Sequence, residues 1–140
     1  MKTLAITLSA VVLMTSFSSC ALLKEKYAKN ERASAAYLSS KRTAPSRMNI
    51  EGVWYSPQWG IVVLNQERGG KLSGIFQDYY TVNGVISGKE AFITLIDDDW
   101  VEYTVELRRQ SWEELKGHYS PSVPFSETGA HELVLKRIGD

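Results

Sequence analysis

Most of the chain alternates between apolar and polar residues with a period of two. In the segment 101–108, valine, tyrosine and leucine side chains take turns with glutamate, threonine and arginine. Such alternation is typical of a β-strand with one buried face and one solvated face. The same alternation recurs in short segments from Asn49 to the end of the chain, so the pattern predicts an all-β domain over residues 49–140.

Turn signals divide this domain into eight short strands. Clusters of Gly, Asp and Glu at 67–70, 88–90 and 97–99, and a longer loop at 120–129, separate the apolar runs. The predicted strands span residues 51–56, 60–66, 71–79, 81–87, 91–97, 101–109, 112–119 and 132–138. One boundary has two interpretations, because Asn83-Gly84 is itself a hairpin signal and would merge the segments on either side of Tyr80.

Eight consecutive strands with tight turns and no intervening helix predict an antiparallel meander closed into a barrel. Closure removes the exposed strand edges that an open sheet would leave. Gly74, Gly88 and Gly117 lie in or next to predicted strands. Glycines at such positions indicate that the sheet bends sharply there or that another group approaches the backbone closely. An open sandwich with glycines at bulges is the alternative fold.

The opening of this domain resembles avidin-type and, more loosely, lipocalin-type barrels. The resemblance rests on Gly52-Val53-Trp54-Tyr55, on Leu72-Ser73-Gly74-Ile75-Phe76 and on Val85-Ile86-Ser87-Gly88. It implies the calycin-like barrel fold. It does not imply biotin binding, because Ser56 and Ile61 stand where avidin-like proteins place an asparagine and a small hydroxyl residue.

The first 20 residues have the layout of a secretory leader. Lys2 precedes an apolar stretch from Leu4 to Phe17, which is too short and too rich in Ser and Thr for a transmembrane helix. Phe17-Ser18-Ser19-Cys20 resembles the lipobox of bacterial lipoproteins, and this resemblance implies a signal peptide over 1–19 and a lipid on Cys20. The alternatives are a plain secreted protein or a free thiol in a cytosolic chain.

By the same resemblance, Ala21 in place of Asp implies sorting to the outer membrane, with the domain facing the periplasm and surface display as an alternative. Residues 20–48 are then a basic tether, with seven basic against two acidic residues, whereas residues 49–140 carry a formal charge of −6. An acidic domain on a basic tether is expected to stand off an anionic membrane. The tether is expected to be helical to about Ser39 and flexible over 39–46. Export and acidity argue against a nucleic-acid partner.

Residues suited to catalysis are sparse. His118 and His131 belong to no hydrolase or zinc motif, and Glu113-Glu114 would face opposite sides of a strand. The carboxylates at 97–99 are the best metal candidate, but they lack the spacing of a calcium loop and are more typical of a solvated turn. The sequence therefore predicts no enzyme, no cofactor and no metal site.

Aromatic residues at predicted turns are the remaining candidates for a binding site. Tyr55, Trp59, Tyr79 and Tyr80 lie there, and they form a candidate binding rim at one end of the barrel. Alternatively, the rings fold down over the barrel mouth. The sequence thus favours a binding or assembly module for a protein or an envelope polymer. A carrier of a small apolar ligand inside the barrel is the alternative function.

Overall fold

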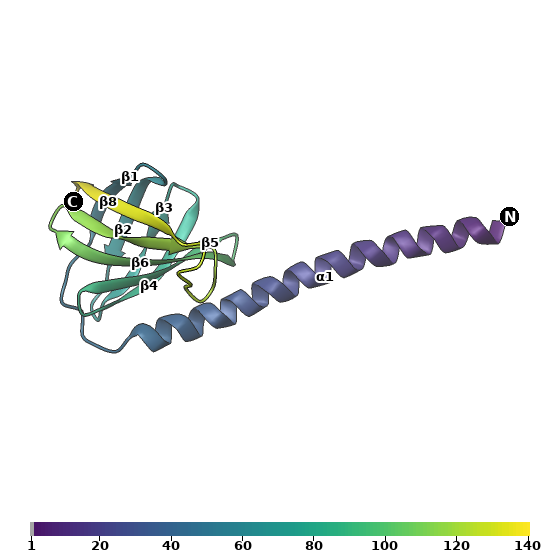
Figure 1. Ribbon diagram of the computed structural model, residues 1–140, viewed down its shortest axis with the longest axis horizontal. Coiled ribbons are helices and arrows are strands. Elements are labelled where there is room, and N and C mark those ends of the chain that lie inside the picture. Colours follow the sequence, from purple (N-terminus) through teal and green to yellow (C-terminus); the bar gives the residue numbers. More distant parts are fainter. Residues whose placement is uncertain (1) are drawn as a thin grey trace.

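A computed structural model describes the backbone of residues 2–140 and the side chains of residues 20–140. One long helix, α1 (Lys2–Lys41), precedes eight strands, and its N-terminal part extends away from the barrel (Figure 1). The strands are β1 (Gly52–Ser56), β2 (Gly60–Gln66), β3 (Lys71–Phe76), β4 (Tyr80–Ser87), β5 (Glu90–Asp97), β6 (Trp100–Ser111), β7 (Glu114–Ser120) and β8 (His131–Gly139).

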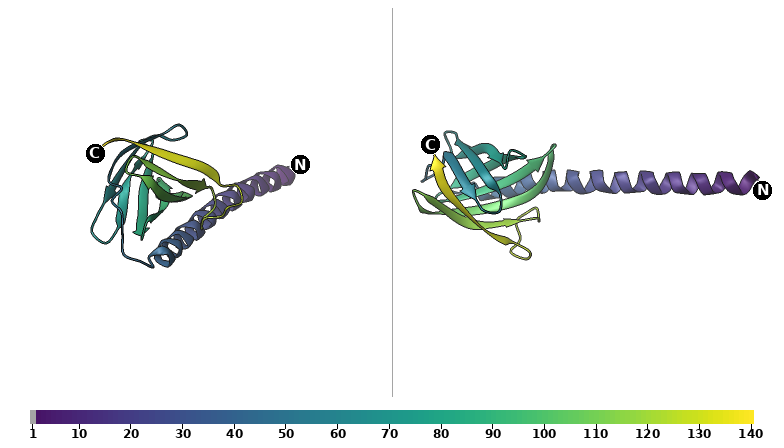
Figure 2. Two further views of the ribbon diagram at one scale, coloured as in Figure 1. Left: turned by 60° about the vertical axis from the view of Figure 1, so that its left-hand side comes forward. Right: turned by 90° about the horizontal axis from the view of Figure 1, so that it is seen from above.

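The strands form a closed antiparallel barrel. Each strand pairs with the next one along the chain, and β8 pairs with β1 to close the circle (Figure 2). The predicted eight-stranded meander barrel is therefore confirmed, and the open sandwich is not formed. Closure leaves no strand edge unpaired, which explains how so many short strands fold without a covering layer on every side.

The boundary between β3 and β4 follows the first of the two interpretations. Phe76 pairs with Tyr80, and the three residues between them make the turn, with Gln77 and Asp78 at positive φ. Asn83 and Gly84 lie inside β4 instead. The hairpin signal is overridden there because β4 must continue past Gly84 to pair with both β3 and β5.

Two of the three strand glycines mark close approach between neighbouring strands. A Cβ at Gly74 would fall against the carbonyl oxygen of Val63, and one at Gly117 would fall against that of Glu106. These contacts confirm the expectation for Gly74 and Gly117. Gly88 differs, because it lies in the turn between β4 and β5 with a φ of 61°.

Inward-pointing side chains fill the barrel. Trp54, Phe76 and the leucines of β2, β3 and β5–β8 form one continuous cluster with exposed fractions of 0 or 1%. The indole N–H of Trp54 donates to the Ile50 carbonyl oxygen at 3.0 Å, so this buried polar group is satisfied. The largest fully buried side chains are Trp54, Phe76, Ile50, Leu64, Leu72, Ile86, Ile93, Leu95, Leu107, Leu115, Leu133 and Leu135.

The C-terminal half of α1 packs on the outer wall of the barrel formed by β4, β5 and β6. Tyr37 and Leu38 are buried there against Val85 and Phe92, and the Tyr37 hydroxyl donates to Glu106 at 2.9 Å. The helix that the sequence predicted to about Ser39 thus continues to Lys41, and its C-terminal half lies against the barrel. Among the residues described, no helix is both apolar and long enough to cross a membrane.

The segment after α1 is also fixed to the barrel. The amides of Thr43 and Ala44 donate to Ser87 Oγ, and Ser46 forms a parallel bridge with Gly88. The expectation of a flexible linker over 39–46 was wrong. The turn between β4 and β5 offers donors and acceptors to this segment, so its polar backbone is paired with protein rather than water.

The meander places its connections alternately at two ends of the barrel. We call the near end the one with the connections 57–59, 77–79, 98–99 and 121–130, and the far end the one with 67–70, 88–89 and 112–113. Helix α1 reaches both ends. Tyr27 lies 4.5 Å from Trp100, ring centroid to ring centroid, at the near end, and the residues that follow Lys41 bind the 88–89 turn at the far end.

Candidate functional site

Trp59 closes the near end of the barrel from inside. It is 7% exposed, and four rings surround it edge-on at centroid distances between 5.1 and 5.8 Å: Phe76, Tyr80, Tyr103 and Tyr119. Such edge-to-face pairs add to the free energy gained by burial. Trp59 was expected on a solvent-exposed rim, and that expectation was wrong.

The turn before Trp59 explains its inward position. Ser56 is fully buried at the end of β1, and its Oγ accepts from the backbone amides of Gln58 and Trp59. These two hydrogen bonds fold the connection back over the barrel mouth, a local arrangement that serine favours at turns. The interpretation in which the rings cover the mouth therefore holds for Trp59.

Two of the other candidate rim residues lie beside this closure. Tyr79 and Tyr80 are 4.9 Å apart, ring centroid to ring centroid, and Tyr80 also packs against Trp59. The Tyr79 hydroxyl donates to Asp97, which raises the pKa of Tyr79 above its ordinary value. Burial, followed by the nearby charge of Glu102, raises the pKa of Tyr80 to about 12.

Tyr55 belongs to a different surface. It points outward from β1, is 45% exposed and forms no ring pair among the side chains described. Its neighbours across β2 and β3 are also outward-facing apolar residues. This outer face consists of Val53, Tyr55, Ile61, Val63 and Ile75. It lies on β1–β3, whereas α1 covers β4–β6.

Cys20 is exposed on α1, in the part of the helix that precedes the contacts with the barrel. The side chains that dock α1 begin with Tyr27. At a rise of about 1.5 Å per residue, Cys20 lies about 10 Å beyond Tyr27 along the helix axis. A lipid on Cys20 would therefore be clear of the barrel on its near side.

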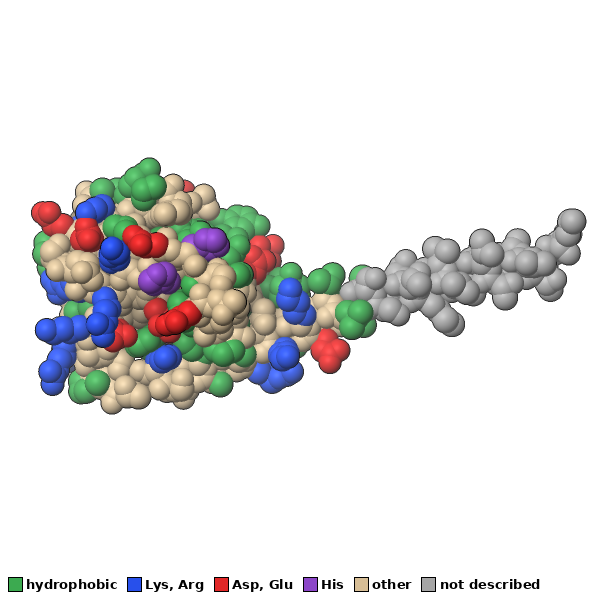
Figure 3. All heavy atoms as spheres, viewed as in Figure 1, with side chains coloured by type: hydrophobic (Ala, Val, Ile, Leu, Met, Phe, Trp, Pro, Cys, Tyr) green, Lys and Arg blue, Asp and Glu red, His purple; other side chains and the backbone are tan. Residues whose placement is uncertain are grey.

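Charge is segregated between the two ends. The connections of the near end carry Asp78, Asp98, Asp99 and Glu127 and no Lys or Arg, whereas every Lys and Arg of the barrel lies in its far half. Basic side chains accordingly gather at the end opposite the projecting helix (Figure 3). These barrel cations are Arg68, Lys71, Lys89, Arg108, Arg109, Lys116, Lys136 and Arg137.

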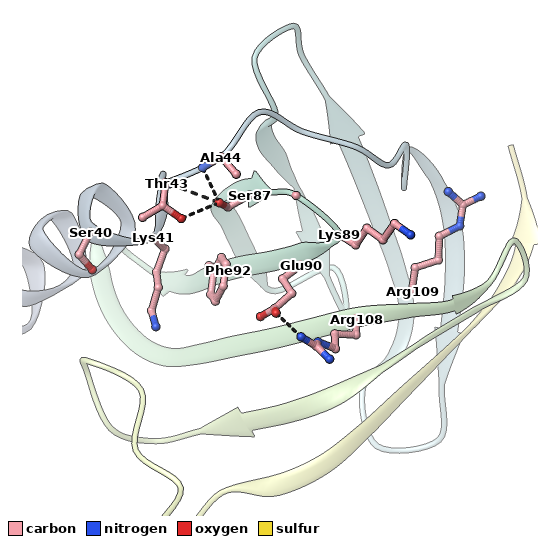
Figure 4. Close-up of a pocket in the computed structure, with 11 residues that line it drawn as sticks. Ser40, Lys41, Thr43, Ala44, Ser87, Lys89, Glu90, Phe92, Arg108 and Arg109 are labelled. Atoms are coloured by element: carbon pink, nitrogen blue, oxygen red, sulfur yellow. Dashed lines mark hydrogen bonds and ion pairs between the residues drawn. The ribbon is translucent and has the colours of Figure 1, made fainter.

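A cleft of about 660 Å³ opens among the far-end cations. Its walls come from the end of α1 and the segment after it, from the 88–89 turn, and from β6 (Figure 4). Phe92 forms an apolar floor, and Ser40, Thr43 and Ser87 supply hydroxyl groups. The charged lining residues are Lys41, Lys89, Glu90, Arg108 and Arg109.

The four cations of this far-end cleft have different partners. Lys41 Nζ lies 3.8 Å from a Glu106 carboxylate oxygen and 5.1 Å from the Phe92 ring centroid. Arg108 pairs with Glu90, whose hydrogen bond raises the pKa of the guanidinium. Arg109 stacks at 5.0 Å on the exposed ring of Trp112, and Lys89 has no ion-pair partner within residues 20–140. Two of the four cations thus have a carboxylate partner, and Lys89 and Arg109 have none within residues 20–140.

The carboxylates and histidines singled out from the sequence form no common site. Asp98 and Asp99 occupy the turn between β5 and β6 with positive φ, and no cluster suited to a metal ion occurs among the described residues. His118 is exposed, and His131 stacks on Tyr119 at 5.2 Å.

No family model, no curated protein and no solved structure matches this chain. The far-end cleft was not foreseen from the sequence, because its charged residues are spread from Lys41 to Arg109. A signal was present nonetheless. Every Lys and Arg of the domain lies near the even-numbered connections, which a meander places at one end.

Proposed function

We propose that this protein is a non-catalytic binding or assembly module of the bacterial envelope, anchored by a lipid on Cys20 to the periplasmic face of the outer membrane. Its partner binds the outside of the barrel, not the interior. The proposal joins the lipobox-like Phe17-Ser18-Ser19-Cys20 to a barrel whose exposed surface is divided into distinct faces.

The filled interior carries this proposal. A carrier of a small apolar ligand needs a cavity of about 300–1,000 Å³ inside its barrel. Here that space holds the side chains of Trp54, Phe76 and ten aliphatic residues, all with exposed fractions below 2%. Trp59 and its four ring partners occupy the near mouth in addition. Expelling such side chains would cost far more than a small ligand returns.

The docked helix supports an oriented display. Asn30 Nδ2 donates to the Val101 carbonyl oxygen, and Tyr37 binds Glu106, so α1 is held at two points along its length. The near end then faces the membrane that holds Cys20, and the far end faces away from it. A module with a fixed orientation loses less entropy on binding a partner than one on a loose tether.

The outer face of β1–β3 fits a protein partner. Tyr55, Ile61 and Ile75 are each exposed by more than two fifths and lie side by side across three strands. Contiguous apolar surface of this kind marks protein interaction sites. Its five members carry no charge, and the charged residues next to it are Lys71 on the same side of β3 and Lys136 of β8, which pairs with Tyr55.

Native mass spectrometry of the protein, extracted from its own host in mild detergent, tests the proposal. We expect a diacyl or triacyl mass increment on Cys20 and a copurifying protein. A Cys20→Ala variant should lose the acyl mass and leave the membrane fraction. A small apolar molecule that stays bound to the folded protein at a one-to-one ratio after desalting would overturn the proposal in favour of the carrier.

The variant Tyr55→Ser with Ile75→Ser tests the outer face. Both side chains are exposed, so folding should be retained while the copurifying protein is lost. Thr81→Ser with Asn83→Ser, which changes exposed polar residues of the neighbouring strand β4, is the matched control and should retain the partner. Equal retention by both variants would move the binding surface elsewhere.

A further inference from the structure

We infer that the far-end cleft is a binding site for a phosphoryl-bearing ligand. This inference deepens the proposed function, on which it rests, by assigning a second face of the barrel and the chemistry of what it binds. The cleft is separate from the apolar face of β1–β3, because its walls are α1, the 88–89 turn and β6.

The charge balance of the cleft selects for an anion. Lys41, Lys89, Arg108 and Arg109 line one volume of about 660 Å³, and Glu90 is the one acidic lining residue. Glu106 and Glu90 already pair with Lys41 and Arg108, so Lys89 and Arg109 leave an excess of two positive charges, and a walled cleft concentrates their field. An anion with two negative charges leaves the site close to neutral.

The donor groups match tetrahedral oxygens. Arg108 and Arg109 occupy successive positions of β6 and therefore leave opposite sides of the strand. Each offers a planar guanidinium fork, which binds phosphate and carboxylate oxygens in bidentate geometry. Lys89 adds an ammonium group with no ion-pair partner among residues 20–140. Figure 4 shows the side chain of Arg108 directed toward Glu90, with Lys41 across from it, and the side chain of Arg109 directed away from Arg108.

Hydroxyl groups complete the donor set on the opposite wall. Ser87 Oγ accepts from the amides of Thr43 and Ala44, which occupies both of its lone pairs, so Ser87 donates its O–H to Thr43 Oγ1 and the O–H of Thr43 is available to donate into the cleft. The Thr43 hydroxyl lies 3.2 Å from Ser87 Oγ, and the two form one polar patch. These bonds also hold the wall rigid, because they fix the segment after α1 to the 88–89 turn.

The position of the cleft argues for a ligand away from the anchoring membrane. Along α1, Lys41 lies about 30 Å from Cys20 at the usual rise per residue. Headgroups of the membrane that holds Cys20 face the near end, where the connections carry Asp78, Asp98 and Asp99. The phosphoryl group therefore belongs to a soluble or polymeric ligand, or to lipid outside that membrane.

Nuclear magnetic resonance on the full chain in non-ionic detergent tests the inference, with glucose 6-phosphate as the probe and glucose as the neutral control. We expect saturable shifts of the backbone amides of Thr43, Ala44 and 88–90 with the phosphorylated sugar alone. Amide shifts of equal size beside every Lys and Arg in the far half of the barrel would overturn the assignment. The absence of any amide shift would overturn it as well. The native mass spectrum described above is independent of this result, so either idea can fail alone.

A pair of double variants separates a built site from a diffuse positive field. Lys89→Gln with Arg108→Gln removes one unpaired and one ion-paired cation of the cleft, and we expect affinity to fall about tenfold or more. Arg68→Gln with Lys116→Gln removes one exposed and one ion-paired cation outside it, and we expect less than a twofold change. Equal losses in both variants would overturn the site.

Dihexanoyl phosphatidic acid, a monomeric lipid, distinguishes the source of the phosphoryl group. Shifts at the same cleft amides with equal or weaker affinity than glucose 6-phosphate support a soluble or polymeric ligand. Tighter binding at those amides assigns the group to a lipid headgroup and keeps the cleft as its site. Amide shifts confined to the apolar face of β1–β3 would mean that the cleft does not bind the phosphoryl group.

Discussion

The two ends of the barrel share one frame and differ in what their side chains do. At the near end, Trp59 and its ring partners turn inward and complete the core, and the surrounding charges are acidic. At the far end, cations remain at the surface around an open cleft. Trp59 at the near end therefore contributes to stability, whereas the far end presents charged side chains to solvent.

The replacement Trp59→Ala gives the largest expected effect on this contrast. It removes a buried indole and four edge-to-face ring contacts, which should cost about 3–5 kcal/mol of the free energy of unfolding. Urea unfolding followed by fluorescence measures the loss. Tyr55→Ala, in the same hairpin but on the outside, is the control and should cost less than about 1 kcal/mol.

If Trp59→Ala were as stable as the parent chain, the near end would not be part of the core. Its rings would then again be candidates for binding, and the difference between the two ends would disappear. The control guards against a general sensitivity of the hairpin from β1 to β2, because Tyr55 lies in β1 and faces solvent.

Docking of α1 connects the two ends, and Tyr37→Ala should weaken it. The ring packs against Phe92 at 6.4 Å between ring centroids, and the hydroxyl donates to Glu106. We expect a cost of about 3 kcal/mol, seen as roughly hundredfold faster amide hydrogen exchange over the C-terminal half of α1. Arg32→Ala, on the exposed side of the same helix, should leave exchange unchanged.

Unchanged protection in Tyr37→Ala would show that the helix is held mainly elsewhere, for example through Asn30. The far-end cleft would then keep its α1 wall in the variant, and ligand affinity should not fall. If protection is lost, affinity for the phosphorylated probe should fall as well, since Ser40 and Lys41 line the cleft.

The sequence predicted the barrel well because period-two alternation and turn residues report local structure directly. Six of the seven connections contain Gly, Asp or Pro, the exception being Trp112-Glu113, and the boundary near Tyr80 lies at the first of the two predicted turns. Asn83-Gly84 shows the limit. A hairpin signal is overruled when the strand gains more by pairing on both sides.

The candidate site was harder to predict because it depends on contacts between distant segments. Nothing local distinguishes a turn tryptophan that points outward from Trp59, which Ser56 folds inward. The stripe that docks α1, with Tyr27, Ser34, Tyr37 and Leu38 at helical spacing, is visible in the sequence only once a partner wall is known. A cleft among scattered cations requires the topology first.

High pH should destabilise the near end. Burial and Glu102 raise the pKa of Tyr80 from 10.0 to about 12 in the folded protein, so its contribution to stability is fully present below pH 10 and is lost as the pH rises through 12. We expect this loss to be on the order of 1–2 kcal/mol after allowance for solvent screening. Tyr80→Phe should flatten this part of the profile, and Tyr55→Phe should not.

Melting temperatures measured from pH 9 to 12 test this expectation. Tyr37 and Tyr79 shift in the same direction, so the profile of the parent chain reports all three residues, and the difference between Tyr80→Phe and the parent isolates one. If the two profiles were parallel, Tyr80 would titrate alike in the folded and unfolded chains, and its ring would not be part of the closure.

Arg108→Gln should have the smallest effect on stability. If the far-end cations do not stabilise the fold as the near-end rings do, removing one of them must change the free energy of unfolding little. The pair that Arg108 forms with Glu90 is exposed, and surface ion pairs contribute between 0 and about 1 kcal/mol. We therefore expect a change in the free energy of unfolding within about 0.5 kcal/mol, measured by the same urea titration as for Trp59→Ala. A stability loss as large as that of Tyr37→Ala would make Arg108 a structural residue of the barrel, and the cations of the far end would then be explained without any ligand.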